Sequence, residues 1–353
     1  MQTIVRGGPR DLIALAWYRI GFRPRESLVL VGLRGGRRRS GVVVRADLPA
    51  AQDRDATLVS VLPMLRRGGS REVVALVVSD AGGGPRPGPD GLPVLAHRDL
   101  DHWLRHTLPR HGIGVFDVLA VGPDSFRKYD CPDPLCCPPE GWPLDDLAGT
   151  ELAAHMVLAG RMVADREEEL VRDVRPQERG RLTRQRVDAA QPADLPAVLA
   201  RWRELVAAGA AHPDRPAELL AGLRDVRLRD AVMFTLVPGS GLLPEQVVAG
   251  QVVASGDRIW ELHPDHDLVE RGRRLLAALA RVAPAGDRAE VLSVLAWLAW
   301  WCCDAVRSRL LAGLALADRP GHRLSSLVAQ LLAAGIPPTW QCLPGDPLTA
   351  PIG

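Results

Sequence analysis

Lysine is almost absent from this 353-residue chain: Lys128 is the only one, which leaves arginine as 43 of the 44 basic residues. Together with plentiful Ala, Gly, Pro, Leu and Val, this bias is typical of a GC-rich genome. The 42 acidic residues nearly balance the basic ones, so the net charge is only +2. A charge this small gives little long-range attraction for nucleic acid. The densest basic run, residues 37–39, falls where a turn between two strands is expected, and we interpret it as a solvated turn.

Segments that would direct the chain to a membrane are also missing. The N-terminal residues lack the charged start, apolar centre and small-residue cleavage site of a secretory signal. The longest nearly apolar run, residues 291–303, is well short of the roughly 20 residues that cross a bilayer. We therefore expect a cytoplasmic protein without a membrane partner, and we interpret this run as a buried helix.

The usual catalytic motifs are absent as well. The sequence has no G-x-S-x-G elbow, no H-E-x-x-H, no kinase set and no phosphate-binding glycine fingerprint. Its cysteines are too few and too uneven for a disulfide framework, so in a reducing cytoplasm they should be thiols or metal ligands. These are Cys131, Cys136, Cys137, Cys302, Cys303 and Cys342.

The length of the chain is enough for two domains, and the patterns differ between its two halves. Up to about residue 125, helix-like and strand-like segments alternate, which predicts an α/β or α+β domain with helices packed on a mixed sheet. The expected helices are 9–20, 55–67 and 100–111, and the expected strands are 27–33, 41–48, 73–78 and 115–121. Between residues 80 and 93 lies a segment rich in Gly and Pro, which we interpret as a surface loop.

The second half of the chain carries helical spacing almost throughout. A helix at 147–163 closes the first domain, which we place at residues 1–164. A charged linker or helix at 165–190 follows, and then an all-α domain at 191–353. Its expected helical segments are 198–206, 219–236, 243–253, 268–282, 291–301, 306–316 and 324–332.

Several short segments together resemble a known family. They are residues 8–12, 21–24, 27–29, 45–49, 228–230, 295–300 and 335–338, and above all Tyr129-Asp130-Cys131 through Cys136-Cys137-Pro138-Pro139-Glu140-Gly141. In these residues the chain is similar to an uncharacterised bacterial family, domain of unknown function 4192. The resemblance spans nearly the whole chain and implies no activity, because the family has no established one.

The cysteine segment is the strongest candidate for a site. Cys131, Cys136 and Cys137 lie within seven positions of a loop that several prolines stiffen. Zinc prefers four tetrahedral sulfur or nitrogen ligands and often takes two from a C-x2-4-C turn, whereas the spacing here is C-x4-C-C. Adjacent cysteines rarely both reach one tetrahedral ion, so we expect a metal site to need a ligand from elsewhere, such as His155.

Two other interpretations of the same segment stay open. The cysteines can be small buried hydrophobic residues in a rigid loop, since free cysteine is among the most buried residue types. They can also form a redox pair, although the C-x-x-C geometry is absent. No cofactor is evident from the sequence, and zinc is the one that these residues could hold.

Four acidic residues are further candidates for a pocket. Asp80 and Asp124 follow predicted strands, and ligands of open α/β sheets bind outside the carboxyl ends of strands. Asp130 and Glu140 lie beside the cysteines. An acidic residue in an ordinary polar turn would look the same.

Two motifs of the helical half have simpler interpretations than a ligand site. Two histidines and two aspartates lie within residues 263–267, where we expect a helix cap and not a metal site. Trp297 and Trp301 share one helix face, and we expect them in the core.

The function that the sequence favours is that of a non-enzymatic binding or protein-interaction protein. A protein partner would bind through the helical domain. The alternative is a metal- or thiol-dependent enzyme centred on the three clustered cysteines with Asp130 and His155.

Overall fold

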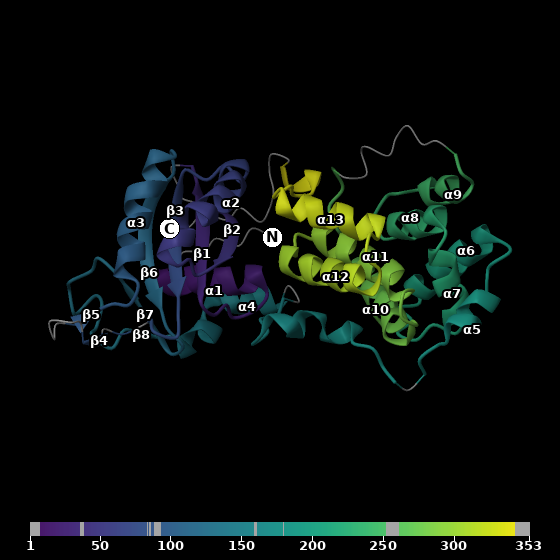
Figure 1. Cartoon of the computed structure of the whole chain (residues 1–353), viewed down its shortest axis with the longest axis horizontal. Helices are drawn as coiled ribbons and strands as arrows, with labels where there is room; N and C mark the ends of the chain where they lie inside the picture. Colours follow the sequence, from purple (N-terminus) through teal and green to yellow (C-terminus); the bar gives the residue numbers. More distant parts are fainter. Residues whose placement is uncertain are drawn as a thin grey trace. The chain divides into compact units, whose positions relative to one another are not determined.

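The computed structural model describes residues 8–35, 39–82, 84, 86–87, 93–158, 161–178, 180–251 and 261–342. They form two compact units that meet in the sequence between Glu167 and Glu168. We call the first the sheet unit and the second the helical unit. All strands in the described residues lie in the sheet unit (Figure 1). This confirms the predicted fold class, a mixed sheet with packed helices followed by an all-α part.

The sheet unit is built on six strands in the order β2-β1-β3-β6-β7-β8. Their bounds are β1 Ser27–Arg34, β2 Arg39–Asp47, β3 Glu72–Val78, β6 Gly114–Val121, β7 Ser125–Lys128 and β8 Trp142–Pro143. β3 and β6 are parallel, and the other neighbours are antiparallel. β2 and β3 both run antiparallel to β1 and are therefore parallel to each other. The chain thus makes two β-α-β steps, from β2 to β3 and from β3 to β6, and β1 lies between the strands of the first.

The helices of the sheet unit are α1 Pro9–Ile20, α2 Arg54–Arg67, α3 Arg98–Arg110 and α4 Glu151–Leu158. α1 has the predicted bounds: Pro9 suits the first turn, and Gly21 ends the helix with φ 89° while its N–H bonds to the Trp17 carbonyl. The expected helix at 147–163 is a 3-10 turn at Asp145–Gly149 followed by the shorter α4. Thr150 separates the two with an extended ψ of 147°, and its hydroxyl accepts a hydrogen bond from the Ala153 N–H.

Both faces of the central strands are buried. On one face, side chains of β1, β3 and β6 pack with leucines of α2 and α3, including Leu65, Leu104 and Leu108. α1 packs against β1 and β2, with α4 beside it. This double coverage explains the unbroken apolar runs of β1 and β3, which a sheet with one solvated face would not need.

Within the loop at 80–93, the structure describes a two-stranded ribbon of β4 Arg86–Pro87 and β5 Pro93–Val94. Residues 83, 85 and 88–92 of this segment lie outside the described residues. So do Arg37 and Arg38 of the basic run, whereas Arg39 begins β2.

The helical unit contains η3 Glu167–Val174, α5 Arg184–Ala189, α6 Leu195–Ala207, α7 Pro216–Leu223, α8 Val226–Thr235, α9 Leu243–Val248, α10 His266–Val282, α11 Arg288–Trp301, α12 Ala305–Asp318 and α13 Arg323–Ala333. The apolar stripe at 219–236, predicted as one segment, is two helices. They divide at Arg224-Asp225, where the Asp225 carboxylate accepts the Arg227 N–H at 2.8 Å and caps α8.

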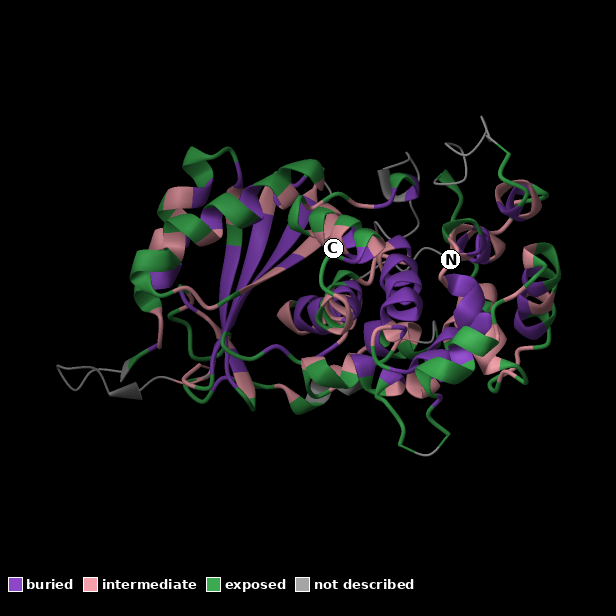
Figure 2. Ribbon diagram, turned by 45° about the vertical axis from the view of Figure 1, so that its right-hand side comes forward, coloured by how far each residue is buried: buried purple, intermediate pink, exposed green. Residues whose placement is uncertain are grey.

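α11 is the central helix of this unit and contacts α7, α8, α10, α12 and α13. Twelve of its fourteen residues are buried, and a helix buried along its length is visible in the middle of Figure 2. The apolar run at 291–303 is therefore the predicted buried helix. In the described part of the chain, no helix is both long and apolar enough to span a membrane.

Candidate metal centre

The three clustered cysteines lie on the loop that joins β7 to β8. Its start is fixed by Tyr129, whose N–H bonds to the Val118 carbonyl at 3.1 Å and whose hydroxyl bonds to the Ala96 carbonyl at 2.6 Å. Its end is fixed by Trp142 of β8, whose Nε1 donates to the Cys136 carbonyl at 2.8 Å. The loop is therefore held on the sheet from both ends.

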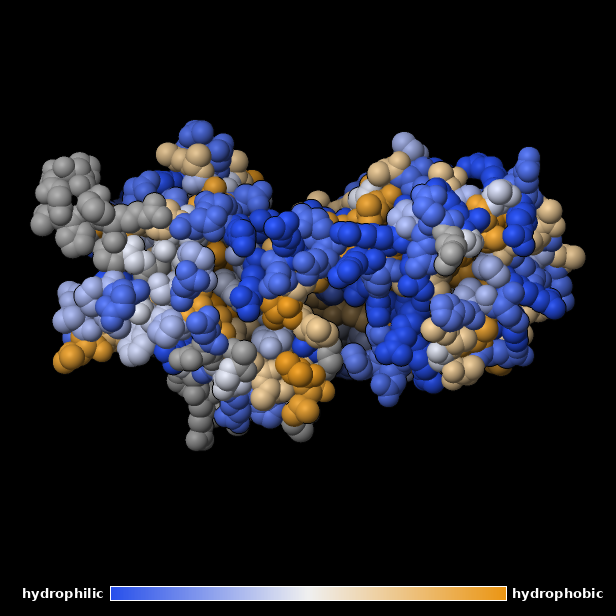
Figure 3. All heavy atoms as spheres, turned by 90° about the horizontal axis from the view of Figure 1, so that it is seen from below, coloured by the Kyte–Doolittle hydropathy of each residue, from blue (hydrophilic) through white to orange (hydrophobic). Residues whose placement is uncertain are grey.

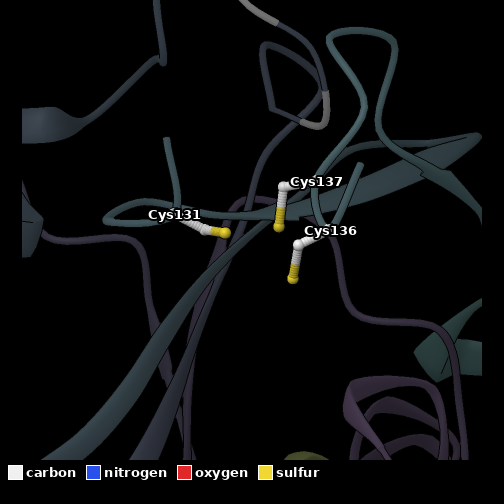
Figure 4. A group of neighbouring side chains, drawn as sticks. All are labelled: Cys131, Cys136 and Cys137. Carbon is white, nitrogen blue, oxygen red and sulfur yellow. The ribbon is translucent and has the colours of Figure 1, made fainter. Parts of the chain in front are cut away.

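A single tight turn brings the cysteines together. The Cys137 N–H bonds to the Asp133 carbonyl at 2.7 Å, and the Asp133 carboxylate accepts the Leu135 N–H at 2.9 Å. The Sγ atoms of Cys131, Cys136 and Cys137 all lie within 4.8 Å of one another (Figure 4). A tetrahedral zinc centre with Zn–S bonds of about 2.3 Å needs sulfurs about 3.8 Å apart, so a small closure of the loop suffices.

Although adjacent cysteines rarely both reach one ion, the sulfurs of Cys136 and Cys137 lie within 4.8 Å of each other and of Cys131. The turn at Asp133 is the reason, because it folds the chain so that neighbouring side chains share one side of the loop.

The three thiols differ in burial and in acidity. An N–H bond from the Asp133 backbone, with help from the Cys137 thiol, lowers the pKa of Cys131. The hydrogen bond between the Cys136 thiol and the Cys131 sulfur raises the pKa of Cys136. Burial raises the pKa of Cys137 to about 11. Cys137 is 2% exposed, whereas Cys131 is half-buried and Cys136 is exposed. Cys131 is therefore the thiol that ionises first, and solvent reaches the cluster from the side of Cys136.

The only lysine of the chain lies beside this cluster. Lys128 Nζ is 2.6 Å from the Asp117 carboxylate, and this bond, together with the thiols of Cys136 and Cys137, raises the pKa of Lys128. By reciprocity, the ammonium favours the thiolate forms of those two cysteines. The backbone of Lys128 also bonds to the Cys137 sulfur, which stabilises its thiolate. Sequence reasoning missed Lys128, although a single lysine among 43 arginines was a usable signal.

The other residues predicted for this site do not join the three sulfurs. Among the described residues, no further His, Cys, Asp or Glu places a ligand atom in the group. His155 lies on α4 with its Nε2 3.6 Å from the Glu151 carboxylate. Asp130 pairs with Arg105 at 3.1 Å, and Glu140 is exposed in the turn that Gly141 closes. The protein ligands that the structure brings together are therefore three.

Asp80 and Asp124 follow β3 and β6 as predicted, and both are exposed. Next to Asp80 is a polar cluster that sequence reasoning missed: Ser79 Oγ lies 2.9 Å from Glu26 Oε1 and 3.1 Å from His97 Nε2. Glu26 and His97 both have positive φ, 38° and 57°. The Ser79 hydroxyl donates its hydrogen bond to the Glu26 carboxylate, so in its contact with His97 it is the acceptor. This order, with serine in the middle, is not that of a nucleophile activated by histidine.

The simpler interpretations of the two helical motifs are confirmed. Asp265 caps α10, since its carboxylate accepts the Leu268 N–H at 2.8 Å. Trp297 and Trp301 are buried and stacked, with ring centroids 5.7 Å apart.

Large exposed apolar side chains are scattered over several elements. The most exposed are Leu135 of the cysteine loop at 90%, and Leu158 and Met162 at 84% and 83%. On the face that Figure 3 shows, hydrophobic residues form small separate patches among hydrophilic ones. The predicted binding of a protein partner through the helical unit stays a prediction.

Comparison with known proteins identifies one family. The model described as "Domain of unknown function (DUF4192)" matches residues 9–339. No curated protein matches the chain, and no solved structure does.

Proposed function

Since the chain belongs to the family "Domain of unknown function (DUF4192)", whose description assigns no activity, we propose its function from the cysteine cluster: it is a zinc-binding protein. Cys131, Cys136 and Cys137 are the protein ligands. The observation that carries the proposal is the convergence of their sulfurs within 4.8 Å on one turn.

The surroundings of the sulfurs support thiolate ligands. Backbone N–H groups of Asp133 and Lys128 bond to two of the sulfurs, and the Lys128 ammonium lies close to Cys136 and Cys137. Such outer contacts are typical of metal centres, where they orient the ligands and offset their charge. Three thiolates with one divalent ion carry a net charge of −1, and the Lys128 ammonium, although paired with Asp117, lessens it.

We propose a binding role rather than catalysis for this centre. Three protein ligands leave a fourth position for water or another donor, an arrangement that catalytic zinc sites share. However, no histidine or carboxylate among the described residues joins the three sulfurs, and Lys128 is paired with Asp117. The enzyme alternative stays a prediction. A cytoplasmic location goes with the proposal, because thiols stay reduced there.

The test is the metal content of the protein purified without chelators and measured by inductively coupled plasma mass spectrometry. We expect close to one zinc per chain, lost in the double variant Cys131→Ser/Cys136→Ser. The matched control is Cys302→Ser/Cys303→Ser, which removes two cysteines at the end of α11 and should keep the zinc. Circular dichroism establishes that each variant folds.

Two results would contradict the proposal. One is a wild-type protein that holds no zinc after reconstitution and gel filtration. The other is equal zinc loss in both double variants, which would place the ion elsewhere. A disulfide between Cys131 and a neighbour in freshly purified protein, with no metal, would favour the redox interpretation instead.

A further inference from the structure

Arginines gather at the end of the sheet unit that lies opposite the cysteine loop. The chain passes through this end several times, at the tip of the β1–β2 hairpin, at the C-terminal ends of α2 and α3, and at the start of β3 (Figure 1). The residues are Arg34, Arg39, Arg66, Arg67, Arg71, Arg110 and His111, which we call the arginine end. All are exposed except Arg34, which is half-buried.

Contacts between the segments show that these residues form one surface. Arg34 and Arg39 are paired in the register of β1 and β2. The Arg71 N–H bonds to the Leu33 carbonyl at 3.0 Å, next to Arg34. The Arg66 guanidinium bonds to the His111 carbonyl at 3.1 Å and so joins the ends of α2 and α3.

The arginine end lacks the ion pairs found elsewhere in the sheet unit. In the described part of the chain, none of its six arginines has a carboxylate within 4.0 Å. By contrast, Arg45 pairs with Asp47, and Arg105 pairs with Asp101. The Nε of Arg34 is buried without a hydrogen-bond partner. Glu72 at the start of β3 adds one negative charge here, but the six arginines outnumber it, so this end keeps a net positive charge.

Helix stability explains only part of this cluster. Cations in the last turn of a helix are favourable because they face the negative end of its dipole, which accounts for Arg66, Arg67 and Arg110. Arg34, Arg39 and Arg71 lie on or next to strands and gain nothing from a helix end. Repulsion among them is a cost that an anionic partner would relieve.

We propose that the arginine end binds the phosphate backbone of a nucleic acid. A guanidinium matches a phosphate with two parallel hydrogen bonds, which suits arginine to this partner. Neighbouring strands are about 4.8 Å apart, so β2, β1, β3 and the turn before β6 spread the charges over on the order of 15 Å. A row of this kind fits a line of phosphates. The six arginines supply charge but no apolar anchor, which favours nucleic acid over a lipid surface.

The proposal reverses the expectation drawn from the net charge. The net charge of +2 is a sum over the whole chain and does not show where the charges lie. Binding to a polyanion depends on the local cluster of cations that contacts the phosphates.

The test uses the full chain and a fluorescein-labelled 20-nucleotide single strand and its duplex, with binding followed by anisotropy between 50 and 200 mM salt. The variant is Arg67→Gln/Arg71→Gln/Arg110→Gln, which leaves the bonded Arg66 in place. The matched control is Arg175→Gln/Arg186→Gln/Arg323→Gln, which removes three exposed arginines of the helical unit and changes the net charge equally.

We expect the wild type to bind, with an affinity that falls at least tenfold over this salt range. The variant should bind at least tenfold more weakly at 50 mM salt. Its plot of log affinity against log salt for the single strand should be shallower by about 2, because each phosphate contact contributes about 0.7. The control should stay within twofold of the wild type.

Three results would overturn the proposal. The first is no binding by the wild type at about 100 µM protein and 50 mM salt, because about 100 µM is the weak end of the usual non-specific affinities even at physiological salt. The second is equal weakening of the variant and the control. The third is binding to phosphatidylserine vesicles or to polyglutamate in the absence of binding to either oligonucleotide. Circular dichroism of both triple variants separates a lost contact from a lost fold.

Discussion

Zinc binding at the cysteine cluster should release between two and three protons near neutral pH. Thiolates bind the ion, so every protonated thiol must lose its proton. The pKa of Cys136 is raised and that of Cys137 is about 11, which leaves both protonated at pH 7. The pKa of Cys131 is lowered, so this thiol contributes at most one more proton.

The pH dependence of the affinity follows from this count. Each proton released multiplies the apparent affinity by about ten per pH unit, so two to three protons give about a 100- to 1,000-fold increase from pH 6.5 to pH 7.5. Competition against a chromophoric chelator at several pH values measures this slope, once the protonation of the chelator is subtracted. The Cys302→Ser protein should give the same slope. A slope of one proton or less would refute the reasoning, since Cys136 and Cys137 could not then both be ligands.

The helical unit gives two further predictions. Burial opposes ionisation of Glu290, but hydrogen bonds from His322 and Arg319 outweigh this effect and hold the pKa of Glu290 below its usual value. The stability that the ionised Glu290 contributes is therefore present above about pH 4.3 and is lost as the pH falls through the pKa of the folded state. Glu290→Gln should therefore lower the free energy of unfolding in urea by about 2 kcal/mol at pH 7 and by clearly less at pH 3.5, whereas an equal loss at both pH values would contradict the ionic role. Gly272→Ala would place a Cβ 2.3 Å from Leu236 Cδ2 and should cost about 1–3 kcal/mol. Gly313→Ala, in open space within α12, should instead stabilise the protein by up to about 1 kcal/mol. If thermal unfolding ranked the two glycine variants in the opposite order, the packing of Leu236 against α10 would not be as described.

Local elements were predictable from the sequence because their signals are local. Pro9 and Gly21 mark both ends of α1, and the apolar runs of β1 and β3 mark buried strands. The insertion of β1 between β2 and β3 was not predictable, because strand order depends on which faces the helices cover and not on any one segment. The short strands β7 and β8 carry too few residues for a periodic pattern.

The cysteine site was predictable in composition but not in geometry. The spacing of Cys131, Cys136 and Cys137 identified the ligands, yet their convergence depends on the Asp133 turn and on the anchoring of Tyr129 and Trp142. These contacts link the loop to other parts of the sheet.

His155 illustrates the opposite limit. Its place on the next helix suggested a fourth ligand, but the fold turns it toward Glu151 on the same helix. The direction in which a helix presents a side chain depends on its packing, which a single sequence records only through its apolar face.

Zinc K-edge X-ray absorption of the reconstituted protein measures the ligands of the ion itself. We expect three sulfur ligands at about 2.3 Å and one lighter nitrogen or oxygen donor at about 2.0 Å. In Cys137→Ser protein one of the three sulfurs should be missing. A first shell of nitrogen and oxygen alone, or one with a single sulfur, would contradict a zinc centre built on Cys131, Cys136 and Cys137.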